Sequence, residues 1–165
     1  MTAWVKRMAT RGALAAIALA LAACQTMPHG GLTRAQTAML RANGFSQTAQ
    51  GWELSFADRL LFAVDSAEIN GEMPATIGRI ASNLQSVGIR RARVYGFTDA
   101  SGSTEYNAQL SQTRAGAVAA VMAASGFAPA DLDVQGMGEA HPVADNATAE
   151  GRQQNRRVVI LITAQ

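Results

Sequence analysis

The sequence predicts an α/β (α+β) fold, a two-layer sandwich in which two helices pack on a small mixed sheet. Two segments carry apolar residues at helical spacing, a strand-like alternation precedes each of them, and two further strand-like segments follow. The predicted order along the chain is therefore β-α-β-α-β-β. Crossovers between parallel neighbours are expected to be right-handed.

The first predicted strand covers residues 52–56, where apolar and polar side chains alternate. A helix is expected over 74–87, because isoleucine, leucine and valine recur there at helical spacing. Pro74 suits a first helical turn, and Gly88 suits the end of the helix. The alternating pattern returns over 91–97 and predicts the second strand.

The longer second helix is predicted over 104–125, between Ser103 as its N-cap and Gly126 as its end. Residues 132–136 form a third, weaker strand pattern. The fourth strand is expected over 157–163, which contains an unbroken apolar run. Such a run predicts a central strand that is covered on both faces, or nearly so.

The first 23 residues have the features of an export signal. Lys6, Arg7 and Arg11 precede an apolar run that is well below the roughly 20 residues of a membrane-spanning helix. The run ends in Leu-Ala-Ala-Cys at 21–24, which resembles the lipobox of bacterial lipoproteins. This resemblance implies cleavage before Cys24 and a lipid on its sulfur. The alternative is an ordinary signal peptide with a chance cysteine.

Three regions follow from this pattern: a lipoprotein signal peptide over 1–23, a lipidated tether over 24–50, and one domain over 51–165. The tether is expected to contain a short helix over 33–43. Gln25 directly follows the cysteine, which resembles the pattern of lipoproteins sorted to the outer membrane. We therefore expect an outer-membrane anchor and a domain that faces the periplasm.

Composition limits the classes of function. The whole chain has 14 lysines and arginines against 12 acidic residues, and without the signal peptide the balance is near neutral. A near-neutral domain lacks the basic footprint of a nucleic-acid-binding protein. His29 and His141 are the only histidines and Cys24 is the only cysteine, so a zinc centre of the usual composition is not expected.

Two charged residues carry the candidate chemistry. Asp99 follows the predicted strand 91–97, and Arg114 lies on the predicted helix 104–125, with Asn107 close beside it on the helical wheel. The wheel places Arg114 within the apolar arc, and a buried arginine needs a nearby anion. One interpretation is an internal ion pair between Asp99 and Arg114. The other is a pocket in which Asp99 binds an ammonium group and Arg114 binds a carboxylate.

The wheel also predicts which face of this helix packs inward. The apolar arc comprises Leu110, Ala117, Val118 and Val121, and the side chains on or near the opposite face are Gln109, Gln112 and Ala119.

Residues 96–115, with Asn107, Leu110, Ser111 and Arg114 in register, resemble the core motif of OmpA-like peptidoglycan-binding domains. Two further segments, 136–142 and 145–158, match the family in the same order. The resemblance covers about 52–162 and is of the peptidoglycan-associated lipoprotein type. It implies noncovalent binding to the diaminopimelate of the peptidoglycan stem peptide, which links the outer membrane to the cell wall.

The resemblance also implies roles for individual residues. Asp99 and Arg114 match the family's charged contacts, Ser101 and Asn107 match polar contacts, and Leu110 lines the pocket. The family's arginine pair falls on Arg156 and Arg157, which are expected to be mainly structural or to form the rim. A protein that only grips the wall breaks no bond, so the chain is not expected to be an enzyme or to need a cofactor.

One departure from the family pattern is Ala63, which stands where an aspartate often follows the phenylalanine and so removes one polar contact from the expected site. Two other functions remain open on the sequence alone. One is an interaction module for other envelope proteins, with weak or no wall binding. The other is an enzyme that acts on peptidoglycan and uses the same pocket to hold its substrate.

Overall fold

The computed structural model describes residues 31–62, 66 and 68–164. Its strands are β1 (Ser46–Gln47), β2 (Trp52–Ala57), β3 (Ala92–Phe97), β4 (Leu132–Gly136) and β5 (Arg157–Ile162). Its α-helices are α1 (Arg34–Ala42), α2 (Asp58–Leu61), α3 (Met73–Ser86), α4 (Thr104–Ala124) and α5 (Ala149–Asn155), and a 3-10 turn, η1, covers Pro129–Asp131.

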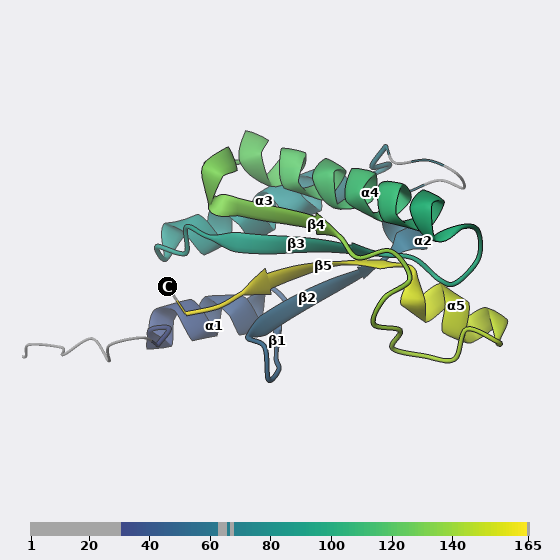
Figure 1. Cartoon of the computed structure of the whole chain (residues 1–165). Helices are drawn as coiled ribbons and strands as arrows, with labels where there is room; N and C mark the ends of the chain where they lie inside the picture. Colours follow the sequence, from purple (N-terminus) through teal and green to yellow (C-terminus); the bar gives the residue numbers. More distant parts are fainter. Residues whose placement is uncertain (1–30, 63–65, 67, 165) are drawn as a thin grey trace, which may run out of the picture.

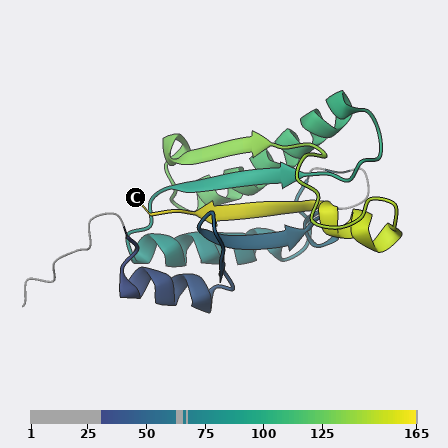
Figure 2. The ribbon, with the colours of Figure 1, turned by 60° about the horizontal axis from the view of Figure 1, so that its bottom comes forward.

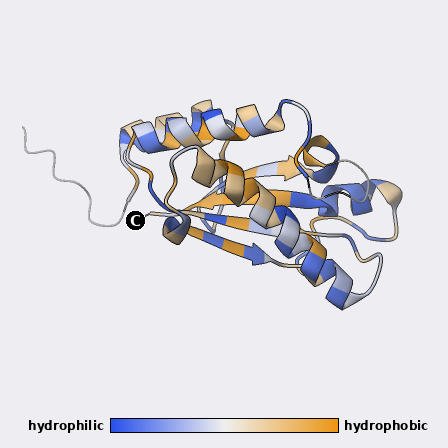
Figure 3. Ribbon diagram, turned by 90° about the horizontal axis from the view of Figure 1, so that it is seen from above, coloured by the Kyte–Doolittle hydropathy of each residue, from blue (hydrophilic) through white to orange (hydrophobic). Residues whose placement is uncertain are grey.

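The strands form one mixed sheet in the order β1-β2-β5-β3-β4. The β3–β4 pair is parallel and the other pairs are antiparallel. Helices α3 and α4 lie side by side on one face of this sheet (Figures 1 and 3). Figure 2 brings the opposite face forward and shows the strands in front of these helices. The predicted two-layer α+β fold is therefore confirmed, and each of the four predicted strands and both predicted helices is present.

Strand β5 lies at the centre of the sheet, between β2 and β3, as its apolar run predicts. Val158, Ile160 and Ile162 belong to the hydrophobic core under the helices. Val159 and Leu161 alternate with them and point to the other face, where they are only 7% and 3% exposed. On this face the neighbouring strands flank them, since Leu161 pairs with Glu53 on β2 and Val159 pairs with Tyr95 on β3.

Helix α4 is rotated relative to the predicted wheel. Its buried residues are Asn107, Ser111, Arg114, Ala115, Val118, Ala119 and Met122. Ala119 was expected on or near the outer face, and this expectation is wrong. Leu110, Ala117 and Val121 were expected on the apolar face but are only half-buried, whereas Val118 is buried as expected.

The rotation follows from a close approach between α4 and the sheet. A Cβ atom added to Gly96 on β3 would lie 2.1 Å from the Ser111 carbonyl oxygen. A Cβ atom added to Gly136 on β4 would lie 2.4 Å from the Gln112 backbone nitrogen. Two glycines of the sheet thus face the backbone of Ser111 and Gln112, so hydropathy alone does not reveal which side of α4 packs inward. The contact fixes the part of α4 that carries Asn107 and Arg114.

Helix α1 packs on the domain, although its residues fall within the expected tether. Thr33 caps the helix in a capping box with Gln36, as expected for its start. Leu40 is fully buried and Phe45 is 4% exposed, and both belong to the same core as α3. The structured unit therefore begins before residue 51. The predicted signal peptide, Cys24, Ala63 and the first residues of the tether lie outside the described residues.

Candidate functional site

Asp99 lies directly beyond the end of β3 and is 5% exposed. The Thr98 N–H donates to the Gly138 carbonyl at 2.8 Å and ties the strand end to the turn after β4. Asp99 Oδ1 accepts the Ser101 N–H at 2.8 Å, which shapes the loop that leads into α4. Asp99 Oδ2 forms an ion pair with Arg156 Nη1. The carboxylate is therefore fixed in position by one backbone and one side-chain contact.

Arg114 reaches from α4 toward α2 and is also 5% exposed. Its Nη1 lies 2.8 Å from Asp58 Oδ1, at the start of α2. Its Nε and Nη2 donate to the Ser66 carbonyl at 3.4 and 3.3 Å. The Phe62 ring stacks 5.1 Å from the guanidinium carbon. These contacts hold the guanidinium in one orientation without using all five of its N–H groups.

Asp99 and Arg114 do not pair with each other, so the interpretation as an internal ion pair between these two residues is wrong. Both line one pocket with a volume of about 590 Å³. The pocket is lined by Asp58, Arg59, Phe62, Asn70, Thr98, Asp99, Ser101, Tyr106, Asn107, Leu110, Arg114, Gln153 and Arg156. All five binding residues expected from the sequence therefore meet at one place.

The polar side chains of the pocket differ in what they offer a ligand. Asn107 is 2% exposed, and its Nδ2 donates to the Asp99 carbonyl at 3.3 Å and to Glu139 Oε2 at 2.6 Å. Both amide hydrogens are thus used, and the Oδ1 acceptor is left for the pocket. Thr98 Oγ1 is buried and has no hydrogen-bond partner among the described residues.

The two arginines of the Arg156–Arg157 pair separate onto different sides of the sheet. Arg156 lines the pocket and has a side chain that is 37% exposed. Arg157 lies over the Phe97 ring, with its guanidinium carbon 3.8 Å from the ring centroid. Arg157 lines a separate hollow of about 830 Å³ on the face of the sheet away from α3 and α4. Of the pair, Arg156 alone lines the candidate pocket.

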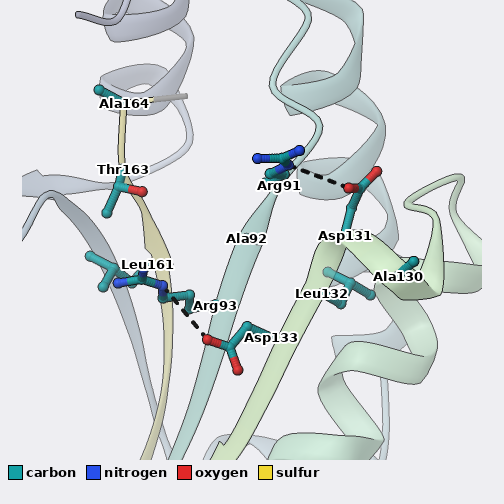
Figure 4. A pocket seen from close by; sticks show the side chains of 10 residues that line it. All are labelled: Arg91, Ala92, Arg93, Ala130, Asp131, Leu132, Asp133, Leu161, Thr163 and Ala164. Carbon is teal, nitrogen blue, oxygen red and sulfur yellow. Dashed lines mark ion pairs between the residues drawn. The ribbon is translucent and has the colours of Figure 1, made fainter. Parts of the chain in front are cut away.

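Another hollow, of about 360 Å³, lies at the opposite end of β3 (Figure 4). There Arg91 points toward Asp131 at 3.5 Å, and Arg93 points toward Asp133 at 3.7 Å. These pairs are largely exposed, and exposed pairs contribute little to stability. Within the described residues, no group of three or more histidine, cysteine or acidic side chains is arranged to hold a metal ion. No helix of the same residues is long and apolar enough to cross a membrane.

Comparison with known proteins decides the family, because residues 61–156 match the OmpA family. The chain belongs to the OmpA family. It is also 40% identical over 154 residues to the "Outer-membrane lipoprotein YfiB" of Pseudomonas aeruginosa, covering 93% of this chain and 92% of that protein. The resemblance expected from the motif at 96–115 is thereby confirmed.

Two solved structures extend the comparison of this OmpA-family domain. The cell wall anchor of the T6SS from Pseudomonas aeruginosa superposes with a TM-score of 0.65 at 30% identity, covering 80% of this chain and 96% of that one. The peptidoglycan-associated lipoprotein from Burkholderia pseudomallei gives a TM-score of 0.56 at 30% identity, covering 65% of this chain and 87% of that one.

Several contributors to the site of this OmpA-family chain were not predicted from the sequence. Asp58 pairs with Arg114, and Glu139 accepts a hydrogen bond from Asn107. The Phe62 ring and the Ser66 carbonyl also contact the Arg114 guanidinium. Asp58 lies before residue 61, where the family match begins, and in a four-residue helix that has no apolar periodicity to reveal it. Glu139 and Asn107 are 32 residues apart, and this contact depends on the turn after β4.

The two carboxylates of the pocket have opposite pKa shifts. Burial raises the pKa of Asp99, but hydrogen bonds from the Ser101 backbone and the Arg156 side chain outweigh it, so the net pKa lies below its usual value. Burial raises the pKa of Asp58 above its usual value, and the charges of Arg114 and Arg156 offset this only in part. Asp99 is therefore a well-stabilised anion, whereas the charge of Asp58 is only partly compensated.

Proposed function

We propose that this chain is an outer-membrane lipoprotein that binds peptidoglycan noncovalently through the diaminopimelate of the stem peptide. The observation that carries the proposal is that Asp99 and Arg114 line one pocket but pair with different residues. An anion and a cation that do not neutralise each other leave separate subsites for the two charges of an amino-acid head group. The names of the two similar structures, a cell wall anchor and a peptidoglycan-associated lipoprotein, support a ligand in the wall.

The ammonium subsite centres on Asp99. A carboxylate has about four lone-pair sites, and contacts with Ser101 and Arg156 leave acceptor capacity on Asp99. Asn107 Oδ1 supplies a further acceptor, because both amide hydrogens of Asn107 are already used within the protein. An ammonium group has three N–H donors, and the two oxygens of Asp99 together with Asn107 Oδ1 provide three acceptor atoms.

The carboxylate subsite centres on Arg114. Contacts with Asp58, Ser66 and Phe62 hold the guanidinium fixed, and a fixed guanidinium loses less freedom when it binds a carboxylate in bidentate fashion. Leu110 and Phe62 supply apolar surface for the aliphatic chain between the two ends of diaminopimelate. Ser101 and Arg156 form the polar part of the rim.

The test is co-sedimentation of the full chain with purified peptidoglycan sacculi, in the presence of rising concentrations of free meso-diaminopimelate. We expect sedimentation in its absence and progressive release in its presence. Sedimentation that free diaminopimelate does not change would show that another group of the wall is bound. Failure to sediment at all would favour an interaction module without wall binding.

The lipid anchor is a separate part of the proposal, and it depends on Cys24. Replacement of Cys24 by serine should abolish incorporation of a radiolabelled palmitate and should move the protein from the membrane fraction to the soluble periplasmic fraction, since serine supplies no thiol for the lipid. Met39→Leu lies outside the predicted signal peptide and is the control variant. It should be labelled and fractionated like the unmodified chain. Unchanged labelling of the serine variant would refute lipidation at this residue.

A further inference from the structure

Asp58 is placed to influence which ligands the pocket accepts. Its backbone N–H donates to the Arg156 carbonyl at 3.0 Å, which fixes the start of α2 beside the end of α5. Its side chain is 14% exposed and lines the pocket, with Oδ1 2.8 Å from Arg114 Nη1. The carboxylate is thus held next to the cation that the proposed function assigns to the ligand's carboxylate.

This position has an electrostatic consequence for any anion that binds Arg114. A ligand carboxylate would come close to the Asp58 carboxylate, and like charges in a partly buried site repel each other. Burial already disfavours the charge of Asp58, and Arg114 and Arg156 compensate it only in part, so the pKa of Asp58 is raised. A positive group on the ligand, next to its carboxylate, would supply the missing compensation.

We propose that Asp58 makes the pocket selective for ligands that carry an ammonium group beside the carboxylate bound by Arg114. The inference rests on the proposed function, and it adds a specificity-determining residue to that site. A ligand with the carboxylate alone meets repulsion from Asp58, whereas a zwitterionic head group presents a cation to both Asp58 and Asp99. The alternative role for Asp58 is purely to position Arg114.

The two roles predict different results for ligands with and without amino groups. Two probes compete with sacculi for the full chain: meso-diaminopimelate, and pimelate, which has the same carbon chain and both carboxylates but no amino groups. The measured quantity is the ratio of the two concentrations that release half of the protein. We expect the unmodified chain to require at least about tenfold more pimelate, because pimelate has no ammonium group to offset the negative charges of Asp58 and Asp99. A tenfold ratio corresponds to about 1.4 kcal/mol.

Asp58→Asn removes the charge and keeps the shape of the side chain, so the ratio should fall at least about threefold, mainly because pimelate binds better. Asp58→Ser removes the charge with a smaller side chain and provides a second test in case the asparagine variant does not fold. Asp58→Glu retains the charge and should keep the ratio close to that of the unmodified chain.

Asp133→Asn is the matched control, because Asp133 pairs with Arg93 on the exposed surface. Circular dichroism checks that each variant is folded.

The outcomes separate this inference from the proposed function. An unchanged ratio in a folded Asp58→Asn or Asp58→Ser variant would overturn the specificity role. If both probes also lose affinity equally, Asp58 only positions Arg114. In either case, release of the unmodified chain by diaminopimelate would leave the proposed function intact. If diaminopimelate does not release the unmodified chain, the proposed ligand is wrong and this inference fails with it.

Discussion

Replacement of Arg114 by glutamine should weaken binding to sacculi by at least about thirtyfold. Loss of one member of a buried charge pair commonly costs about 2–5 kcal/mol, and about 1.4 kcal/mol corresponds to a tenfold change in affinity. Glutamine remains polar but supplies no positive charge for a carboxylate. The measurement is the fraction of the chain that sediments over a range of sacculus concentrations.

The matched control is Arg93→Gln, because Arg93 is half exposed and forms a surface pair with Asp133. Such a pair is worth about 0–1 kcal/mol, so this variant should bind sacculi like the unmodified chain. Arg114→Gln also leaves Asp58 without its nearest cation. Thermal unfolding must therefore accompany the binding assay. Full sedimentation of a folded Arg114→Gln variant would contradict the role of Arg114 in binding.

Replacement of Gly96 by alanine should destabilise the domain by about 3 kcal/mol or more, the upper range for overpacking in a well-packed core. The new Cβ atom would lie 2.1 Å from the Ser111 carbonyl oxygen, which is backbone and cannot rotate away. Helix α4 would have to move off the sheet, and Arg114 and Asn107 would move with it. The free energy of unfolding from urea titration measures the loss of stability.

Gly116→Ala is the control for this change. Gly116 lies on the same helix, and a Cβ atom there meets nothing within 4 Å. Alanine in the interior of a helix is favoured over glycine by about 1 kcal/mol, so this variant should be as stable as the unmodified chain or more so. Equal stability of the two alanine variants would mean that α4 does not pack against β3 as closely as the structure has it.

Local sequence signals were sufficient for most of the fold. The caps Ser103 and Thr33 bond the N–H groups of Tyr106 and Gln36, as N-cap residues do. The apolar run of β5 marked the central strand. Short elements without periodicity were not predicted, namely α2, α5, the 3-10 turn η1 and the two-residue strand β1. The inward face of α4 was misjudged because two glycines on the sheet, rather than large apolar residues on the helix, determine the contact.

The candidate site was predictable as a set of residues but not as a set of contacts. The buried position of Arg114 on an otherwise apolar surface indicated an anionic partner, and Asp99 was the candidate because it follows the preceding strand. The actual partner, Asp58, is 56 positions before Arg114, and the sheet register between β2 and β5 brings it there. Long-range pairing of this kind depends on topology, which local patterns do not encode. The alternation of side chains along the extended backbone places Arg157 on the opposite side of the sheet from Arg156.

The most direct test of the central claim is calorimetric titration of the full chain with free meso-diaminopimelate, repeated with Asp99→Asn and Arg114→Gln. The account predicts saturable binding of one ligand per chain, and at least about a thirtyfold loss of affinity in each folded variant. Binding that persists unchanged in both variants, or no binding by an unmodified chain that still sediments with sacculi, would contradict it.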